Sequence, residues 1–242
     1  MGWWINSPYQ CRVFYVGLYQ FQPGDGQPTI EAIFYDVTSQ RIKNQVIYAY
    51  RCFPLTFVNN EISDVNCNNT WNQIMGVYNY AYGSSGTNPH DISRNVFTKL
   101  QENQNNTANY VYPMYMYYLP QNSKVNNNLI HHISPNCGPS YETYMYLMMV
   151  YYPYPTTEVA HNVLDKVDMD RAWNYYYSTC YGMYVYGATP TYGYDAHSNI
   201  VTNLTGSYTM PYYYGTYMYN VGVTYSNVWN IQDYAHGWTG PG

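Results

Sequence analysis

Residues 141–152, YETYMYLMMVYY, carry the most regular hydrophobic pattern of the chain. Apolar side chains fall on both alternating sides of this stretch, for example Met145 on one side and Met148 on the other. A strand covered on both faces has this pattern, and a buried helix segment is the alternative. Because a proline and a glycine flank the stretch and tyrosine favours strands, we predict a strand.

The remaining apolar segments are short and separated by turn residues. Residues 11–21, 29–37 and 42–53 resemble three strands of a meander, and further strand patterns occur between 109 and 231. No repeat of fixed period and no linker stands out. Many short strands with turn signals are typical of a sandwich or barrel. We therefore expect one β-rich domain over 1–242, a jelly-roll-like β-sandwich, with a mobile tail at 237–242.

Two segments have helical spacing. Residues 89–102 begin with Pro89 directly after Asn88, a favourable helix start, and place Ile92, Val96 and Leu100 on one stripe. Residues 157–180 form the longest helix candidate, and Gly182 follows them at a position suited to a C-terminal cap. These segments predict helical excursions packed on the sandwich.

The composition is unusual for a globular protein. Tyrosine accounts for 36 of the 242 residues and asparagine for 27, whereas charged residues make up only 10%. Low charge with many aromatic residues is the opposite of the disorder pattern, so the chain should fold around tyrosine. Few carboxylates are available to be protonated in acid, which predicts an acid-stable protein. Tyrosines left on the surface predict self-association, because aromatic residues are enriched at interfaces.

Charge and targeting patterns exclude several classes of function. The net charge is −5 and the basic residues are scattered, which argues against nucleic-acid binding. The N-terminal sequence does not resemble a signal peptide, and no apolar run is long enough for a transmembrane helix. Five cysteines, an odd number without a C-x-x-C pair, leave the disulfide pairing open.

Three groups of residues could carry chemistry. Glu158, His161 and Asp165 are spaced as metal ligands on one helix face would be, although a solvated polar stripe explains the same spacing. A second possible cation site contains Asp165, Asp168 and Asp170, and a surface charge run is its alternative. The third group pairs the thiol of Cys137 with His131 and His132, but nothing nearby in the sequence activates that thiol. Familiar catalytic motifs are absent, so the sequence predicts no cofactor.

Two kinds of surface site are also predicted. Asn68, Asn105 and Asn203 match the glycosylation acceptor pattern, which chance alone produces in a chain so rich in asparagine. The C-terminal stretch 211–229 is dense in tyrosine and interrupted by glycine, so a strand there should be half exposed. We expect it to form a subunit interface through Tyr212, Tyr213, Tyr214, Tyr217 and Tyr219.

Stretches such as NYVYPMYMYY, SYTMPYYYGTYMYN and YSNVWNI resemble the structural proteins of viruses of acidophilic hot-spring archaea. The resemblance extends over the chain and rests on the general character of these tyrosine-rich stretches, without a diagnostic motif. It implies a jelly-roll capsid, penton or turret-like subunit located in a virion or outside the cell, with itself and other coat proteins as partners. The leading hypothesis is therefore a self-assembling structural protein. The alternatives are a secreted acid-stable hydrolase with paired carboxylates and a carbohydrate-binding β-sandwich.

Overall fold

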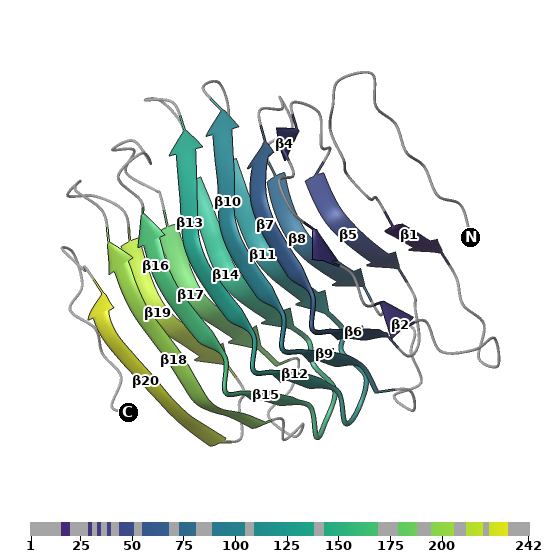
Figure 1. Ribbon diagram of the computed structural model, residues 1–242. Helices are drawn as coiled ribbons and strands as arrows, with labels where there is room; N and C mark the ends of the chain where they lie inside the picture. Colours follow the sequence, from purple (N-terminus) through teal and green to yellow (C-terminus); the bar gives the residue numbers. More distant parts are fainter. Residues whose placement is uncertain are drawn as a thin grey trace.

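A computed structural model describes fourteen segments of the chain, listed in full here: 16–19, 29–30, 33–34, 38–39, 44–50, 55–67, 73–80, 89–104, 109–137, 143–168, 179–187, 195–205, 212–219 and 223–231. Every regular element in these segments is a β-strand (Figure 1). The predicted tail at 237–242 lies outside them.

The strands form two parallel sheets that wind together as a solenoid (Figure 1). The first sheet has seven strands, in the order β1 (Val16–Tyr19), β5 (Asn44–Tyr50), β8 (Gln73–Tyr80), β11 (Asn109–Tyr117), β14 (Thr143–Tyr151), β17 (Thr179–Tyr186) and β19 (Tyr212–Tyr219). We call it the seven-stranded sheet.

The second sheet has two strips. Its short strands are β2 (Thr29–Ile30), β6 (Thr56–Val58), β9 (Asp91–Ser93), β12 (Lys124–Asn126) and β15 (Glu158–Ala160). Its other strands are β3 (Ile33–Phe34), β4 (Thr38–Ser39), β7 (Glu61–Cys67), β10 (Val96–Gln104), β13 (Leu129–Cys137), β16 (Val163–Asp168), β18 (Asp195–Thr205) and β20 (Val223–Ile231). The strips are joined through β18, which pairs with both β15 and β16.

One coil of the solenoid consists of a strand of the seven-stranded sheet, a short strand and a long strand. For example, β11, β12 and β13 make one coil, and β14 begins the next, parallel to β11. Each strand thus pairs with its counterparts one coil before and after. This arrangement is a parallel β-solenoid, in which each repeat contacts mainly its neighbours.

The parallel pairing corrects the predicted jelly-roll sandwich, whose strands would be antiparallel. The predicted meander of 11–21, 29–37 and 42–53 is also wrong, because β1 pairs directly and in parallel with β5. The expectation of a β-rich fold is confirmed over the described residues. The prediction of a strand within 141–152 is confirmed as β14, which lies between β11 and β17.

Both predicted helices are wrong, and a turn explains why each looked helical. Within 89–102, strands β9 and β10 are separated by Arg94 and Asn95, and within 157–180, strands β15 and β16 are separated by His161 and Asn162. Arg94 and His161 have positive φ angles of 57° and 57°. Buried side chains in strands recur at even spacings, and a two-residue turn between short strands preserves this parity. A spacing of four residues therefore occurs among the buried side chains, and four residues also separate side chains on one face of a helix.

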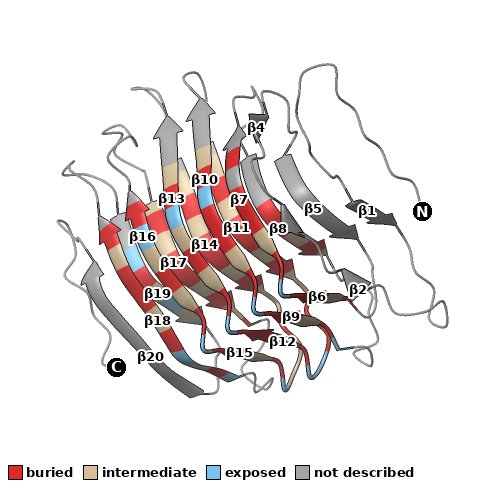
Figure 2. Cartoon of the chain, viewed as in Figure 1, coloured by how far each residue is buried: buried red, intermediate tan, exposed pale blue. Residues whose placement is uncertain are grey.

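The core lies between the sheets, and Figure 2 shows that buried positions of neighbouring strands lie side by side from coil to coil. Met114, Met148 and Met183 are paired across β11, β14 and β17, and all three are fully buried. The alternation within β14 slips by one residue, because the adjacent Leu147 and Met148 are both buried. Its other face carries half-buried tyrosines and does not belong to the core. The prediction of core on both faces of this strand is therefore wrong.

An asparagine ladder lines the turn between the two strips. It consists of the buried residues Asn60, Asn95, Asn128, Asn162 and Asn199, which are 35, 33, 34 and 37 residues apart. Each Nδ2 donates to the Oδ1 of the next asparagine at 3.0 Å. The preceding residue in each coil has a positive φ, which is costly for residues other than glycine. The ladder's hydrogen bonds offset that cost by fixing the turn.

Candidate functional site

Tyrosine side chains cover most of the outer face of the seven-stranded sheet. Inward positions of β11, β14 and β17 are buried, and the positions between them are half-buried tyrosines in most cases. Parallel pairing places each tyrosine beside its counterpart in the next coil, as for Tyr117, Tyr151 and Tyr186. The fold therefore converts a repeated pattern in the sequence into straight rows of rings.

Two rows, which we call the tyrosine ladders, are continuous over several coils. The first ladder contains Tyr80, Tyr117, Tyr151, Tyr186 and Tyr219, with ring centroids 5.1, 5.3, 5.0 and 4.8 Å apart and interplanar angles of 7–13°. The second contains Tyr112, Tyr146, Tyr181 and Tyr214, with centroids 5.3, 4.8 and 4.7 Å apart. Stacked pairs of this kind contribute about 0.5–1.5 kcal/mol each beyond their buried area.

Several tyrosines of this face keep their protons well into the alkaline range. Burial, followed by the neighbouring phenols, raises the pKa of Tyr115, Tyr181 and Tyr184 to about 12. Burial also raises the pKa of Tyr112 above its usual range. The hydroxyl of Tyr151 donates to that of Tyr152 at 3.5 Å, and this bond is the main reason that the Tyr151 pKa is raised. The face is therefore an uncharged array of phenols at neutral and acidic pH.

The ladders end at β19, the last strand of the seven-stranded sheet in the described part of the chain. Tyr214 and Tyr217 are 36% and 37% exposed, and Tyr219 is 46% exposed. Tyr214 stacks on Tyr181 and Tyr217 stacks on Tyr184, with centroids 4.7 and 4.8 Å apart. All three exposed tyrosines belong to the predicted interface. Of the other two members, Tyr212 and Tyr213, the structure describes only the backbone, in the same strand.

The stacking determines what the face presents to a ligand. Each ring inside a ladder has its two faces against the tyrosines of adjacent coils, so ring edges and hydroxyls point outward. A platform that stacks on sugars would have to present ring faces. This geometry does not favour the predicted carbohydrate-binding role.

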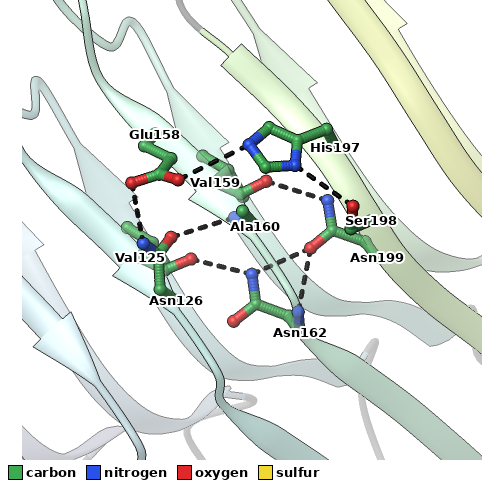
Figure 3. Close-up of polar contacts among 9 residues, drawn as sticks. All are labelled: Val125, Asn126, Glu158, Val159, Ala160, Asn162, His197, Ser198 and Asn199. Atoms are coloured by element: carbon green, nitrogen blue, oxygen red, sulfur yellow. Dashed lines mark hydrogen bonds and ion pairs between the residues drawn. The ribbon is translucent and has the colours of Figure 1, made fainter.

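A polar relay occupies the strip formed by β12, β15 and β18 (Figure 3). Glu158 accepts a hydrogen bond from Asn126 Nδ2 at 2.9 Å, and its Oε1 lies 3.4 Å from His197 Nε2. His197 Nδ1 lies 3.2 Å from the Ser198 hydroxyl. If Nε2–H donates to Glu158, Nδ1 is left to accept from Ser198. A hydroxyl, an imidazole and a carboxylate are thus in the order that nucleophilic catalysis uses.

The predicted metal ligands Glu158, His161 and Asp165 do not share a helix face. They lie in β15, in the turn and in β16, respectively. Asp165 accepts a hydrogen bond from Asn203 Nδ2 at 2.6 Å, and Glu158 belongs to the relay. Over the side chains that the structure describes, no group of three histidine, cysteine or acidic residues is arranged to hold a metal ion.

The other predicted sites are only partly described. His131 and His132 have their Nδ1 atoms 2.5 Å apart, and burial followed by His132 lowers the pKa of His131. The Cys137 and Asp168 side chains, and all of Asp170, lie outside the described part. The one cysteine whose thiol is described, Cys180, is free and fully buried, and burial raises its pKa.

The three predicted glycosylation sites also differ in what is described. Asn68 and Asn105 lie outside the described residues. Asn203 lies in β18 with a φ of 54°, and its amide is bonded to Asp165.

The sequence analysis missed the ladders and the repeat that produces them. The repeat is visible as Asn followed by two apolar residues at Asn95, Asn128, Asn162 and Asn199. The first three directly precede β10, β13 and β16, and Asn199 lies within β18. It escaped notice because the spacing varies from 33 to 37 residues. Aligning the chain on these asparagines also brings the tyrosine rows into register.

The comparisons with known proteins found no relative from which a family or a function could be inferred. A scan against protein-family models found no match, and searches of curated proteins and of solved structures also found none. Among the residues that the structure describes, no helix has the length and apolar character needed to cross a membrane.

Proposed function

We propose that this protein is a structural subunit that associates with further copies of itself end to end, through the edge of the seven-stranded sheet at β19. The observation that carries the proposal is the pair of tyrosine ladders, which run through successive coils and end at β19 on the exposed rings of Tyr214 and Tyr219. An open strand edge is a template for another strand. Here it is combined with ring faces that the next coil would cover.

The proposed occupant of this edge is a second copy of the same chain. The seven-stranded sheet begins with β1 and ends with β19, and all its pairings are parallel. A second copy that places its β1 against β19 continues the same strand order and direction. Such a contact is head-to-tail, and its repetition along the solenoid axis generates an open filament instead of the ring that a closing rotation would give.

The setting of this assembly is proposed from composition alone. The resemblance to coat proteins of viruses of acidophilic hot-spring archaea supports a subunit of a virion or of an extracellular filament, with other coat proteins as further partners. A face of uncharged tyrosines suits an acidic medium, because acid does not change its charge.

The test compares Tyr214→Ser/Tyr219→Ser, which removes the last ring of each ladder, with the wild type by light scattering and electron microscopy over a range of concentrations. The wild type should form particles elongated in multiples of one subunit, and the edge variant should remain monomeric with little change in unfolding temperature. A matched control, Tyr112→Ser/Tyr115→Ser, removes two rings from β11 inside the sheet. It should lower the unfolding temperature but still assemble below it. A monomeric wild type, or an edge variant that assembles normally, would refute the proposal.

The second candidate is a hydrolase, favoured by the polar relay of Glu158, His197 and Ser198. In this role Ser198 is the nucleophile, His197 takes its proton and Glu158 orients the imidazole. A fluorophosphonate probe should label the wild type at Ser198 and fail to label Ser198→Ala. Equal labelling of the two proteins, or none of either, would exclude this candidate.

A further inference from the structure

The tyrosine ladders place pairs of phenols from adjacent coils in contact. In the first ladder, Tyr117, Tyr151 and Tyr186 have centroids 5.3 and 5.0 Å apart, although they are far apart in sequence. These side chains are half-buried, so their outer edges are open to small reagents. A pair held in this way needs only ring rotation to bring two ortho carbons together.

Phenols in such contact can be joined covalently by oxidation. Loss of one electron and one proton from a tyrosine gives a phenoxyl radical with spin on its ortho carbons. Two such radicals form one carbon–carbon bond, and the ortho hydrogen of each ring then moves as a proton to its own oxygen, which restores the phenol. The balance is two tyrosines plus one hydrogen peroxide giving one dityrosine and two waters, with a haem peroxidase as the class of catalyst that transfers the electrons.

We propose that the two tyrosine ladders are sites of oxidative cross-linking between coils, in which dityrosine bonds staple each coil of the solenoid to the next. The ladders run across β8, β11, β14, β17 and β19, so successive bonds would secure most of the seven-stranded sheet. This inference concerns bonds within one chain and does not depend on self-association.

Two features of the structure direct the coupling. Cys180 is fully buried, so its thiol does not compete at the surface for the oxidant. The row that contains Tyr115 and Tyr184 is interrupted by Met149 on β14, which pairs with both of them. Tyr115 and Tyr184 are therefore two coils apart and cannot be joined, so they provide a negative control within the same face.

The experiment oxidises the full-length protein in dilute solution with photoactivated ruthenium tris-bipyridine and persulfate, a small one-electron oxidant. Dityrosine is measured by its fluorescence, and linked peptides are identified by mass spectrometry. Mixing isotopically heavy and light protein separates links within one chain from links between chains. We expect single-isotope links at Tyr117–Tyr151, Tyr151–Tyr186 and Tyr146–Tyr181, no Tyr115–Tyr184 link, and a higher unfolding temperature after oxidation.

The matched variant is Tyr151→Phe, which keeps the ring in the stack but cannot form a phenoxyl radical. Both links to position 151 should be lost, whereas the Tyr146–Tyr181 link of the second ladder should persist and show that the sheet is intact. Absence of dityrosine, links that are mainly between chains, or a Tyr115–Tyr184 link as frequent as those within the ladders would overturn the inference. An unfolding temperature that oxidation leaves unchanged would show that the bonds do not staple the coils.

Discussion

Replacing Asn128 by alanine should remove the middle of the asparagine ladder. Its Nδ2 donates to the carbonyl of Ile92 at 2.9 Å and to Asn162 Oδ1 at 3.0 Å. Its Oδ1 accepts from the backbone N–H and from the Nδ2 of Asn95, both at 3.0 Å. All four hydrogen bonds are buried, and alanine offers none of them.

The expected cost follows from these four bonds. At about 1 kcal/mol of net stability for each bond, the loss is about 4 kcal/mol, and more if the buried N–H of Asn95 finds no other acceptor. For a chain of this size, such a loss lowers the unfolding temperature by roughly 8–16 °C.

Calorimetry and urea unfolding of Asn128→Ala measure this effect. The matched control is Asn127→Asp at the exposed neighbouring position. Asp keeps the size of the side chain and tolerates the positive φ of this residue, so this variant should stay within about 0.5 kcal/mol of the wild type. A loss below about 1 kcal/mol for Asn128→Ala would mean that the ladder does not hold the turn. Unfolding should be followed with two probes, because repeat proteins can unfold coil by coil.

Three further changes test other parts of the structure. Burial lowers the pKa of His90 to about 3, and its Nδ1 accepts from the Leu55 N–H, so the unfolded chain takes up the proton first as pH falls. The contribution of His90 to the free energy of unfolding should be fully present above about pH 6.5 and be lost towards pH 3, a decrease on the order of 5 kcal/mol. This prediction differs from the acid stability expected from the small number of carboxylates. His90→Asn should flatten the pH profile in urea titrations at several pH values. Asn79 is fully buried and both polar atoms of its side chain lack hydrogen-bond partners, so Asn79→Leu should raise the free energy of unfolding by about 1–3 kcal/mol, and a decrease would show that the amide is satisfied in solution. A Cβ on Gly182 would lie 2.3 Å from Val201 Cγ1 and 2.6 Å from a backbone carbonyl oxygen of β19. Gly182→Ala should therefore lower the thermal midpoint by an amount equivalent to about 1–3 kcal/mol or more, and an unchanged midpoint would refute this close packing.

Much of the local structure could be predicted from the sequence, but the architecture could not. The alternation around Met145 correctly predicts a strand. The expectation that the chain folds around tyrosine is wrong over the described side chains, because none of their tyrosines is buried and the core consists mainly of aliphatic residues and methionine. Parallel pairing escapes prediction because the partners lie a whole coil apart, so no hairpin turn links them. The turn at His161 then gives Ala160 and Leu164 the four-residue spacing of a helix stripe.

The predicted sites show the same limit. The exposed tyrosines of β19 were found because three neighbouring tyrosines must occupy both faces of a strand. The polar relay was missed, because Glu158 and His197 meet only through the register of β15 with β18. His90 was missed because nothing local shows that its ring will be buried at a turn.

The coil of 33–37 residues also makes the length of this molecule adjustable in whole units. Removing residues 128–161 would connect the coil that begins at Asn95 directly to the coil that begins at Asn162. The asparagine ladder, the core rows and the tyrosine rows of the two coils would remain in register. Each such step changes the rod by one strand spacing, about 4.8 Å. Gene duplication or loss of a single coil would therefore produce longer or shorter rods with the same two end strands, so the length can change while the ends stay the same.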